Sequence, residues 1–182
     1  MKSGAMGAQI ADPYAKALMS IADDRDLANR IGENMAMLQQ LLKDSPELAE
    51  FLDNPIVAPE DKKAVLRRVV ESEIEPVALN FLLLLVDRGR ILFLEEVCKR
   101  YRALLRERNQ TVLAEVTSTV ELAGSQREAI ESKVKDLTGA RQVEIEAKID
   151  PDIIGGVIIK VGSQVFDASL RGQLRRLAVS LS

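Results

Sequence analysis

Residues 149–170 read IDPDIIGGVIIKVGSQVFDASL, and this stretch decides how the C-terminal part of the chain folds. Gly162 and Ser163 separate two short apolar runs, and a two-residue loop with glycine first is typical of a type II′ β-hairpin. A phosphate-binding loop places its glycines between a strand and the start of a helix, whereas Gly155 and Gly156 precede a strand. We therefore interpret this glycine pair as a bulge or a close backbone approach at the entrance to the hairpin.

The residues before the hairpin alternate between apolar and polar side chains. TVLAEVTSTVEL at 111–122 and QVEIEAKID at 142–150 follow this period of two, which predicts two half-buried strands. Between them we expect a helix that begins at Ser125, because Glu128 three residues later completes a capping box. In the second strand the side chains expected to face inward are Val143, Ile145, Ala147 and Ile149.

After the hairpin, Asp167 is expected to cap a last helix. The leucines on one face of that helix are Leu170, Leu174, Leu177 and Leu181. Residues 111–182 are thus predicted to form a small α+β domain, with a β-hairpin-containing sheet and two helices.

The first part of the chain, up to Gln110, has helical periodicity instead. Prolines at 46, 59 and 76 stand where helices are expected to begin, and the run from Leu79 to Val86 is apolar on almost every side, which is typical of a central buried helix. One face of the first helix carries Ile10, Tyr14, Ala17, Leu18 and Ile21. The fold class predicted for the whole chain is mainly α plus α+β: a disordered start at 1–9, a six-helix bundle at 10–110 and the small domain at 111–182.

The composition excludes several kinds of chemistry. The chain has no His and a single Cys, Cys98, so Ser-His and Cys-His pairs and the usual zinc sites cannot form. We expect no metal, no cofactor and no catalytic residues. A net charge of −3 does not favour nucleic acid, and no apolar run approaches the roughly 20 residues that a membrane span needs.

Two groups of charged residues leave alternatives open. Basic side chains on the helix before Gln110 are either a solvated face or a docking surface for an acidic partner; they are Lys99, Arg100, Arg102, Arg106 and Arg108. Glu144 and Glu146 share one strand face and could do acid–base work, but we interpret them as solvated surface. The residues alone therefore favour an interaction protein, with a helical-bundle RNA-binding or transcription-associated adaptor as the alternative to a structural connector.

Several stretches resemble the delta-subunit family of the proton-translocating ATP synthase, called oligomycin-sensitivity-conferring protein in mitochondria. They are PYAKAL at 13–18, DRGRI at 87–91, AEVTSTVEL at 114–122, VEIEAKIDPDIIGGVIIKVG at 143–162 and VFDASLRGQLRRL at 165–177. The resemblance extends from Ile10 to Leu181, and the stretch QIADPYAKALMSIA resembles the cyanobacterial and chloroplast branch.

This resemblance implies a non-catalytic subunit of the peripheral stalk, or stator, on an energy-transducing membrane. The helical domain would bind N-terminal helices of the alpha subunits through Tyr14, Ala17 and Leu18 on the first helix and Leu84 on the fifth. The C-terminal domain would meet the b-type stalk helices. The implied location is the cytoplasmic or stromal side of the thylakoid membrane, in a peripheral complex.

Overall fold

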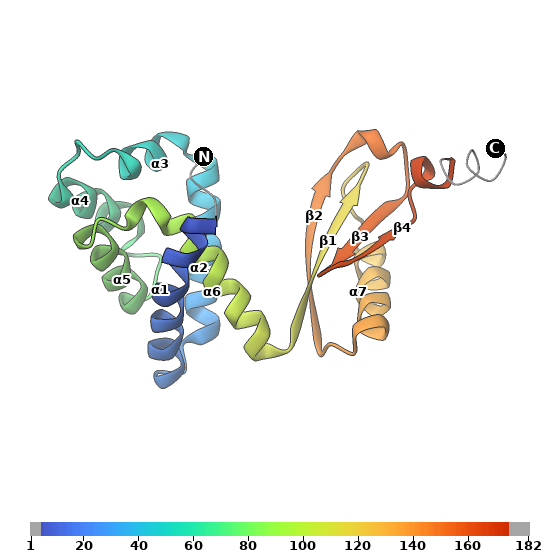
Figure 1. The fold of residues 1–182 in the computed structure, drawn as a ribbon, viewed down its shortest axis with the longest axis horizontal. Coiled ribbons are helices and arrows are strands. Elements are labelled where there is room, and N and C mark those ends of the chain that lie inside the picture. The colour runs from blue at the N-terminus through green and yellow to red at the C-terminus, as the bar shows by residue number, and fades with distance from the viewer. Residues whose placement is uncertain (1–4, 175–182) are drawn as a thin grey trace. The chain divides into compact units, whose positions relative to one another are not determined.

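The computed structural model describes residues 5–174, and the chain divides into two compact units between Leu105 and Arg106 (Figure 1). The first unit is helical, and the second combines a four-stranded sheet with a helix. The division lies within the last helix of the first unit, near the boundary at Gln110 that the change of period predicted. Each unit is described separately below.

Helices make up the first unit. They are α1 (Ala5–Asp24), α2 (Ala28–Asp44), α3 (Pro46–Asp53), α4 (Pro59–Val70), α5 (Pro76–Asp87), the 3-10 turn η1 (Ile91–Phe93) and α6 (Leu94–Asn109). Three of them start with proline at the first helical position, as the sequence predicted. The described part of this unit thus has one helical element, η1, beyond the predicted six-helix bundle. Because α1 begins at Ala5, the expectation of a disordered start is wrong for residues 5–9; residues 1–4 lie outside the described residues.

The buried face of α1 differs from the predicted apolar stripe. Ala11, Ala15 and Leu18 have no exposed surface, whereas Ala17 and Ile21 are exposed. Small alanines lie in the core because they let neighbouring helices approach closely. The predicted stripe therefore contains the buried Leu18 but leaves out the buried Ala11 and Ala15.

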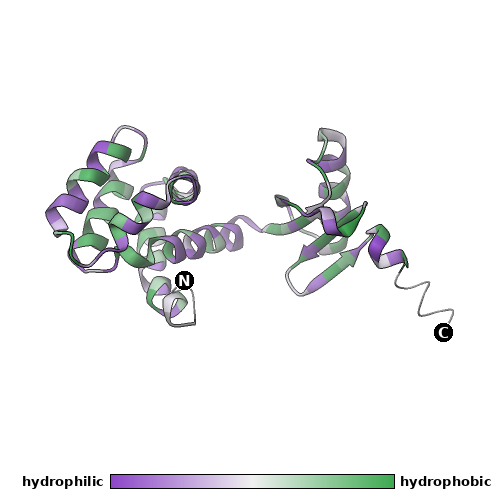
Figure 2. Cartoon of the chain, turned by 90° about the horizontal axis from the view of Figure 1, so that it is seen from above, coloured by the Kyte–Doolittle hydropathy of each residue, from purple (hydrophilic) through white to green (hydrophobic). Residues whose placement is uncertain are grey.

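Helix α5 packs against α1, α4 and η1, and Figure 2 shows the apolar colouring of this unit. Its side chains from Leu79 to Val86 are buried except for Asn80 and Leu84. Polar contacts join α6 to the other helices: the Tyr101 hydroxyl donates to the carbonyl oxygen of Ala28 at 3.0 Å. The helical prediction for this run is confirmed, with one side left open to solvent.

The second unit is a βαβ element followed by a hairpin. Its elements are β1 (Thr111–Ser118), α7 (Gly124–Thr138), β2 (Gln142–Ile149), the 3-10 turn η2 (Pro151–Ile153), β3 (Val157–Val161) and β4 (Gln164–Asp167). The strand order is β2-β1-β3-β4, with β1 and β2 parallel and the other pairs antiparallel. Parallel neighbours need a crossover, and α7 supplies it. Strand β1 lies between β2 and β3, so its Ala114 pairs with both Ile145 and Val161. Ala114 belongs to the same core as Ile130 and Val134 of α7.

Three details of this unit differ from the sequence prediction. The first strand ends at Ser118, before the predicted end at residue 122. Helix α7 starts at Gly124, and the Gln126 side-chain oxygen accepts from the Ala123 backbone N–H at 2.9 Å, so Ser125 does not cap it. Ala147 and Ile149 are exposed because β2 is an edge strand whose far end no described element covers.

The glycines of the hairpin act as the sequence predicted. Gly156 has φ +79°, and a side chain there would overlap the backbone carbonyl oxygen of Ala168. Gly162 has φ +57° at the first position of the two-residue turn, while Ser163 keeps a negative φ, as a type II′ turn requires. The close approach and the hairpin turn are both confirmed.

Asp167 organises the start of the helical turn that follows β4, but not as the cap itself. Its Oδ1 atom accepts from the backbone N–H and the hydroxyl of Ser169 at 2.9 and 2.6 Å. The Ser169 hydroxyl in turn accepts from the Gly172 backbone N–H at 3.0 Å, so Ser169 is the capping residue. Asp167 holds the Ser169 side chain in place. The predicted positions Leu177 and Leu181 lie outside the described residues.

Candidate partner-binding surface

The residues that the family resemblance indicated for partner binding lie on α1 and α5, two helices that pack against each other. Tyr14 is half-buried against the core, Ala17 is exposed and Leu84 is 43% exposed. Leu18 is fully buried, because its side chain points into the bundle, so it is a core residue and leaves the candidate surface.

Two further residues extend this surface, and sequence reasoning did not assign them to it. Ile21 is 44% exposed and lies one turn after Ala17 on α1. Asn80 is exposed and lies one turn before Leu84 on α5. In the sequence, Ile21 stands out only as an apolar residue of the first helix. Asn80 gives the clearer indication of an exposed position, because it is the only polar residue within the run from Leu79 to Val86. We call Tyr14, Ala17, Ile21, Asn80 and Leu84 the α1–α5 surface.

The second unit also exposes apolar side chains. Ile149, Ile154, Val165, Leu170 and Leu174 are all exposed. The glycine pair holds Leu170, which packs against Gly155 and whose backbone N–H donates to the Gly155 carbonyl oxygen at 2.9 Å. The glycine pair and Asp167 therefore have structural roles in shaping this unit, whereas Ser125 makes no capping contact.

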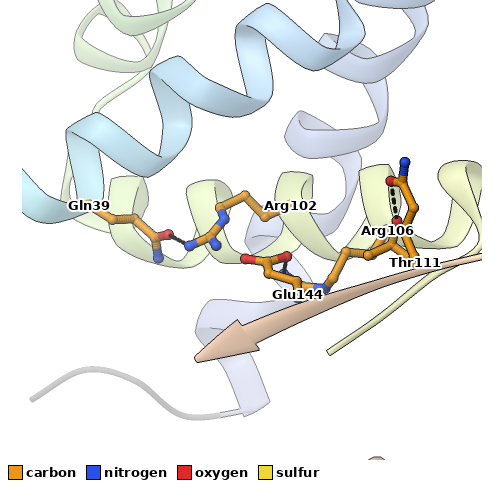
Figure 3. Close-up of polar contacts among 6 residues, drawn as sticks. Gln39, Arg102, Arg106, Thr111 and Glu144 are labelled. Atoms are coloured by element: carbon orange, nitrogen blue, oxygen red, sulfur yellow. Dashed lines mark hydrogen bonds and ion pairs between the residues drawn. The ribbon is translucent and has the colours of Figure 1, made fainter. Parts of the chain in front are cut away.

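Charged residues that could suggest chemistry are engaged in ordinary contacts. Glu144 is half-buried and pairs with Arg106, with 3.1 Å between Oε2 and Nη1, so the interpretation of Glu144 as plain solvated surface is wrong (Figure 3). Arg102 donates to the Gln39 side-chain oxygen at 3.0 Å, and Arg100 pairs with Asp12 at 2.6 Å. These arginines of α6 are thus tied to the protein itself.

Neither Cys98 nor the acidic side chains of the described residues form a reactive or metal-binding site. Burial raises the pKa of the Cys98 thiol to about 12, so the thiol stays protonated at neutral pH. Across residues 5–174 no group of three or more acidic or Cys side chains could hold a metal ion. No described helix is both long enough and apolar enough to cross a bilayer.

The helical unit and the βαβ-hairpin unit each expose apolar side chains, which is compatible with a protein that binds partners through both units. Comparison with known protein families identifies the family to which the chain belongs. The model of the family described as "ATP synthase delta (OSCP) subunit" matches residues 10–181. The chain belongs to this family.

Curated relatives agree over the full length. ATP synthase subunit delta of a Cyanothece species is 56% identical over 100% of this chain and 98% of the relative. The same subunit of Trichodesmium erythraeum is 55% identical over 95% of each chain, and that of a Synechocystis species is 52% identical over 100% and 98%. A chain of the Toxoplasma gondii mitochondrial ATP synthase hexamer shares the fold, with a TM-score of 0.74 and 24% identity over 94% of this chain and 96% of that one.

Membership of this family fixes the general role. The protein is a non-catalytic subunit of the peripheral stalk of the proton-translocating ATP synthase, a peripheral membrane complex, and it helps to hold the catalytic head against the torque of the rotor. Neither the family nor the relatives support the alternative of an RNA-binding or transcription-associated adaptor.

Proposed function

We propose that the α1–α5 surface binds an N-terminal helix of the ATP synthase alpha subunit. The observation that carries this proposal is Leu84, which is 43% exposed although both of its neighbours, Leu83 and Leu85, are buried. An exposed leucine between buried neighbours loses the free energy that burial would provide, roughly 2 kcal/mol for the whole side chain. A partner that covers Leu84 would recover much of it.

The rest of the surface suits an amphipathic helix. Ala17 has a small side chain, so a partner backbone can approach α1 closely, and Ile21 adds a second apolar contact. Asn80 supplies a polar group one turn from Leu84, and such a group can fix the register of the bound helix. Helices that bind in this way place residues of one face, spaced three and four apart, into a groove.

We further propose that the second unit binds the b-type helices of the stalk through its exposed apolar residues. A connector that resists torque needs an interface at each end, and Leu170 and Leu174 are spaced like two contacts of one helix face. The cyanobacterial relatives support a place for the complex on the cytoplasmic or stromal side of the thylakoid membrane.

The test of the α1–α5 surface compares two exposed apolar residues of the same bundle. Leu84→Glu should weaken binding of a peptide from the alpha-subunit N-terminus by roughly 30- to 1000-fold, or about 2–4 kcal/mol, as measured by calorimetry with the full chain. Val69→Glu is the matched control, because Val69 on α4 is 41% exposed but lies outside the surface. Equal affinities of the two variants would contradict the proposal.

The second interface and the location have separate tests. Leu174→Glu should weaken binding of a soluble b-type stalk segment, whereas Leu137→Glu on α7, also an exposed leucine, should not. Cell fractionation should recover the protein with thylakoid membranes. Recovery with the plasma membrane alone would contradict the thylakoid assignment.

A further inference from the structure

A small pocket lies in the bundle where the end of α2, α3, η1 and the start of α6 meet. Its volume is about 190 Å³. Sites for drug-sized ligands have volumes of roughly 300–1,000 Å³, so this pocket is too small for most of them but has room for one side chain. None of the residues that line it belongs to the α1–α5 surface.

The pocket combines an apolar wall with an acidic rim. Leu52, Ile91 and Leu94 are buried and form part of the wall. The rim carries three carboxylates, Asp53, Glu95 and Glu96, against one ammonium group, that of Lys43. An apolar wall beneath an acidic rim complements a side chain with an alkyl stem and a cationic head.

The two glutamates of the rim differ in their contacts. Glu95 and Glu96 lie in the first turn of α6, where the helix dipole favours negative charge. Glu95 pairs with Lys99 at 2.5 Å, but Glu96 has no hydrogen bond or ion pair within the part of the chain that the structure describes. Glu96 therefore remains available to a cation from outside.

Gln39 provides a second polar group, inside the pocket. It is only 7% exposed, and its side-chain oxygen accepts from Nη1 of Arg102 at 3.0 Å (Figure 3). Because a guanidinium group only donates, the oxygen must face Arg102, and the amide nitrogen is left without a partner among the described residues. No buried side-chain nitrogen or oxygen in residues 5–174 lacks a partner, so this nitrogen is not sealed in the core. We assign its opening to the pocket, because Gln39 is one of the residues that line it.

We infer that this pocket binds a lysine or arginine residue of a partner polypeptide. The alkyl stem packs on the wall formed with Leu52, Ile91 and Leu94, and the cationic head meets Glu96 at the rim. A peptide carbonyl oxygen of the same residue accepts a hydrogen bond from the Gln39 amide. The pocket is a docking point of the bundle separate from the α1–α5 surface, and its occupancy does not depend on the function proposed there.

The test uses the full-length, isotope-labelled protein and N-acetyl-arginine N-methylamide, which has a guanidinium head and two peptide carbonyls. Nuclear magnetic resonance should show saturable shifts of the Gln39 side-chain amide and the Glu96 backbone amide, with a dissociation constant in the millimolar range. The citrulline analogue has nearly the same shape without the charge, and it should bind about threefold to tenfold more weakly. Glu96→Gln should produce a similar loss, whereas Glu128→Gln on α7 should leave binding unchanged.

A second variant tests the cavity rather than the charge. Ala49→Leu on α3 places a larger side chain in the lining, and it should abolish the saturable shift at Gln39. If Ala49→Leu does not fold, as judged by circular dichroism, the comparison of Glu96→Gln with Glu128→Gln decides. Equal binding of the arginine and citrulline compounds, or no saturable shift at Gln39, would overturn the inference.

Discussion

The close approach at Gly156 leads to a quantitative prediction for Gly156→Ala. The backbone at this residue has φ +79°, and the new Cβ would overlap the carbonyl oxygen of Ala168. Gly162 has φ +57° but open space around the position of a Cβ. Gly162→Ala therefore adds backbone strain alone, about 1 kcal/mol, whereas Gly156→Ala adds the same strain plus a steric clash of about 1–3 kcal/mol.

The clash at Gly156 has little room to relax. The obstructing atom belongs to the backbone, and hydrogen bonds fix the residues around it. The Ala168 N–H donates to the carbonyl oxygen of Val157 at 3.0 Å, and the Leu170 N–H donates to the carbonyl oxygen of Gly155. A unit of roughly 80 residues is stabilised by about 4–12 kcal/mol, so a loss of about 2–4 kcal/mol is a large share. Gly156→Val, which adds a β-branched side chain, should cost still more.

Thermal unfolding of the full chain measures the difference. Each 1 kcal/mol should lower the melting temperature of a unit of this size by about 4–8 °C. The transition of the second unit should therefore fall by roughly 10 °C or more in Gly156→Ala but by clearly less in Gly162→Ala, with the transition of the helical unit unchanged. Equal shifts in the two variants would refute the role assigned to the Ala168 carbonyl, and an unchanged melting temperature would refute both contributions.

Four other predictions concern partner binding, folding and chemistry. Ala17→Arg should leave the melting temperature unchanged, since Ala17 is exposed, but lower the affinity for an alpha-subunit N-terminal peptide by roughly 30- to 1000-fold; unchanged affinity would remove Ala17 from the surface. A polypeptide of residues 1–108 should give helical circular dichroism and a cooperative melt, because the bundle has its own core; an unfolded chain would contradict two separate units. Cys98 should resist iodoacetamide at pH 8 until the protein is unfolded, because its pKa is about 12; rapid alkylation of the native protein would contradict its burial. Calorimetric titration with Mg-ATP should show no micromolar binding, because the glycine pair shapes a hairpin; a tight constant would reopen the phosphate-loop interpretation.

The hairpin and the helix starts were predictable because they depend on local chemistry. Gly162 and the prolines at 46 and 59 act through the φ angles they allow, and those do not depend on distant residues. The cap of α7 is also local, but the sequence analysis assigned it to Ser125 with Glu128. In the structure Gln126 reaches back to the Ala123 N–H instead.

The exposed surfaces could not be predicted from periodicity because they depend on which neighbour covers each face. Ile149 alternates as perfectly as Ile145, yet it is 57% exposed because it lies at the uncovered end of an edge strand. Leu18 and Ile21 share one apolar stripe, and only the packing of α1 places the first in the core and the second in water. The family resemblance indicated α1 and α5, but it did not separate the surface residues from the core residues.

The strand order of the second unit has a consequence for how the chain folds during synthesis. The central strand β1 is made first, but its two neighbours, β2 and β3, are completed only when residues 149 and 161 have left the ribosome. The helical unit can fold as soon as its last helix emerges, while β1 must wait with both edges unpaired. Chains that stall between residues 118 and 142 therefore expose a β-strand with no partner, which is a target for chaperones and a site of aggregation.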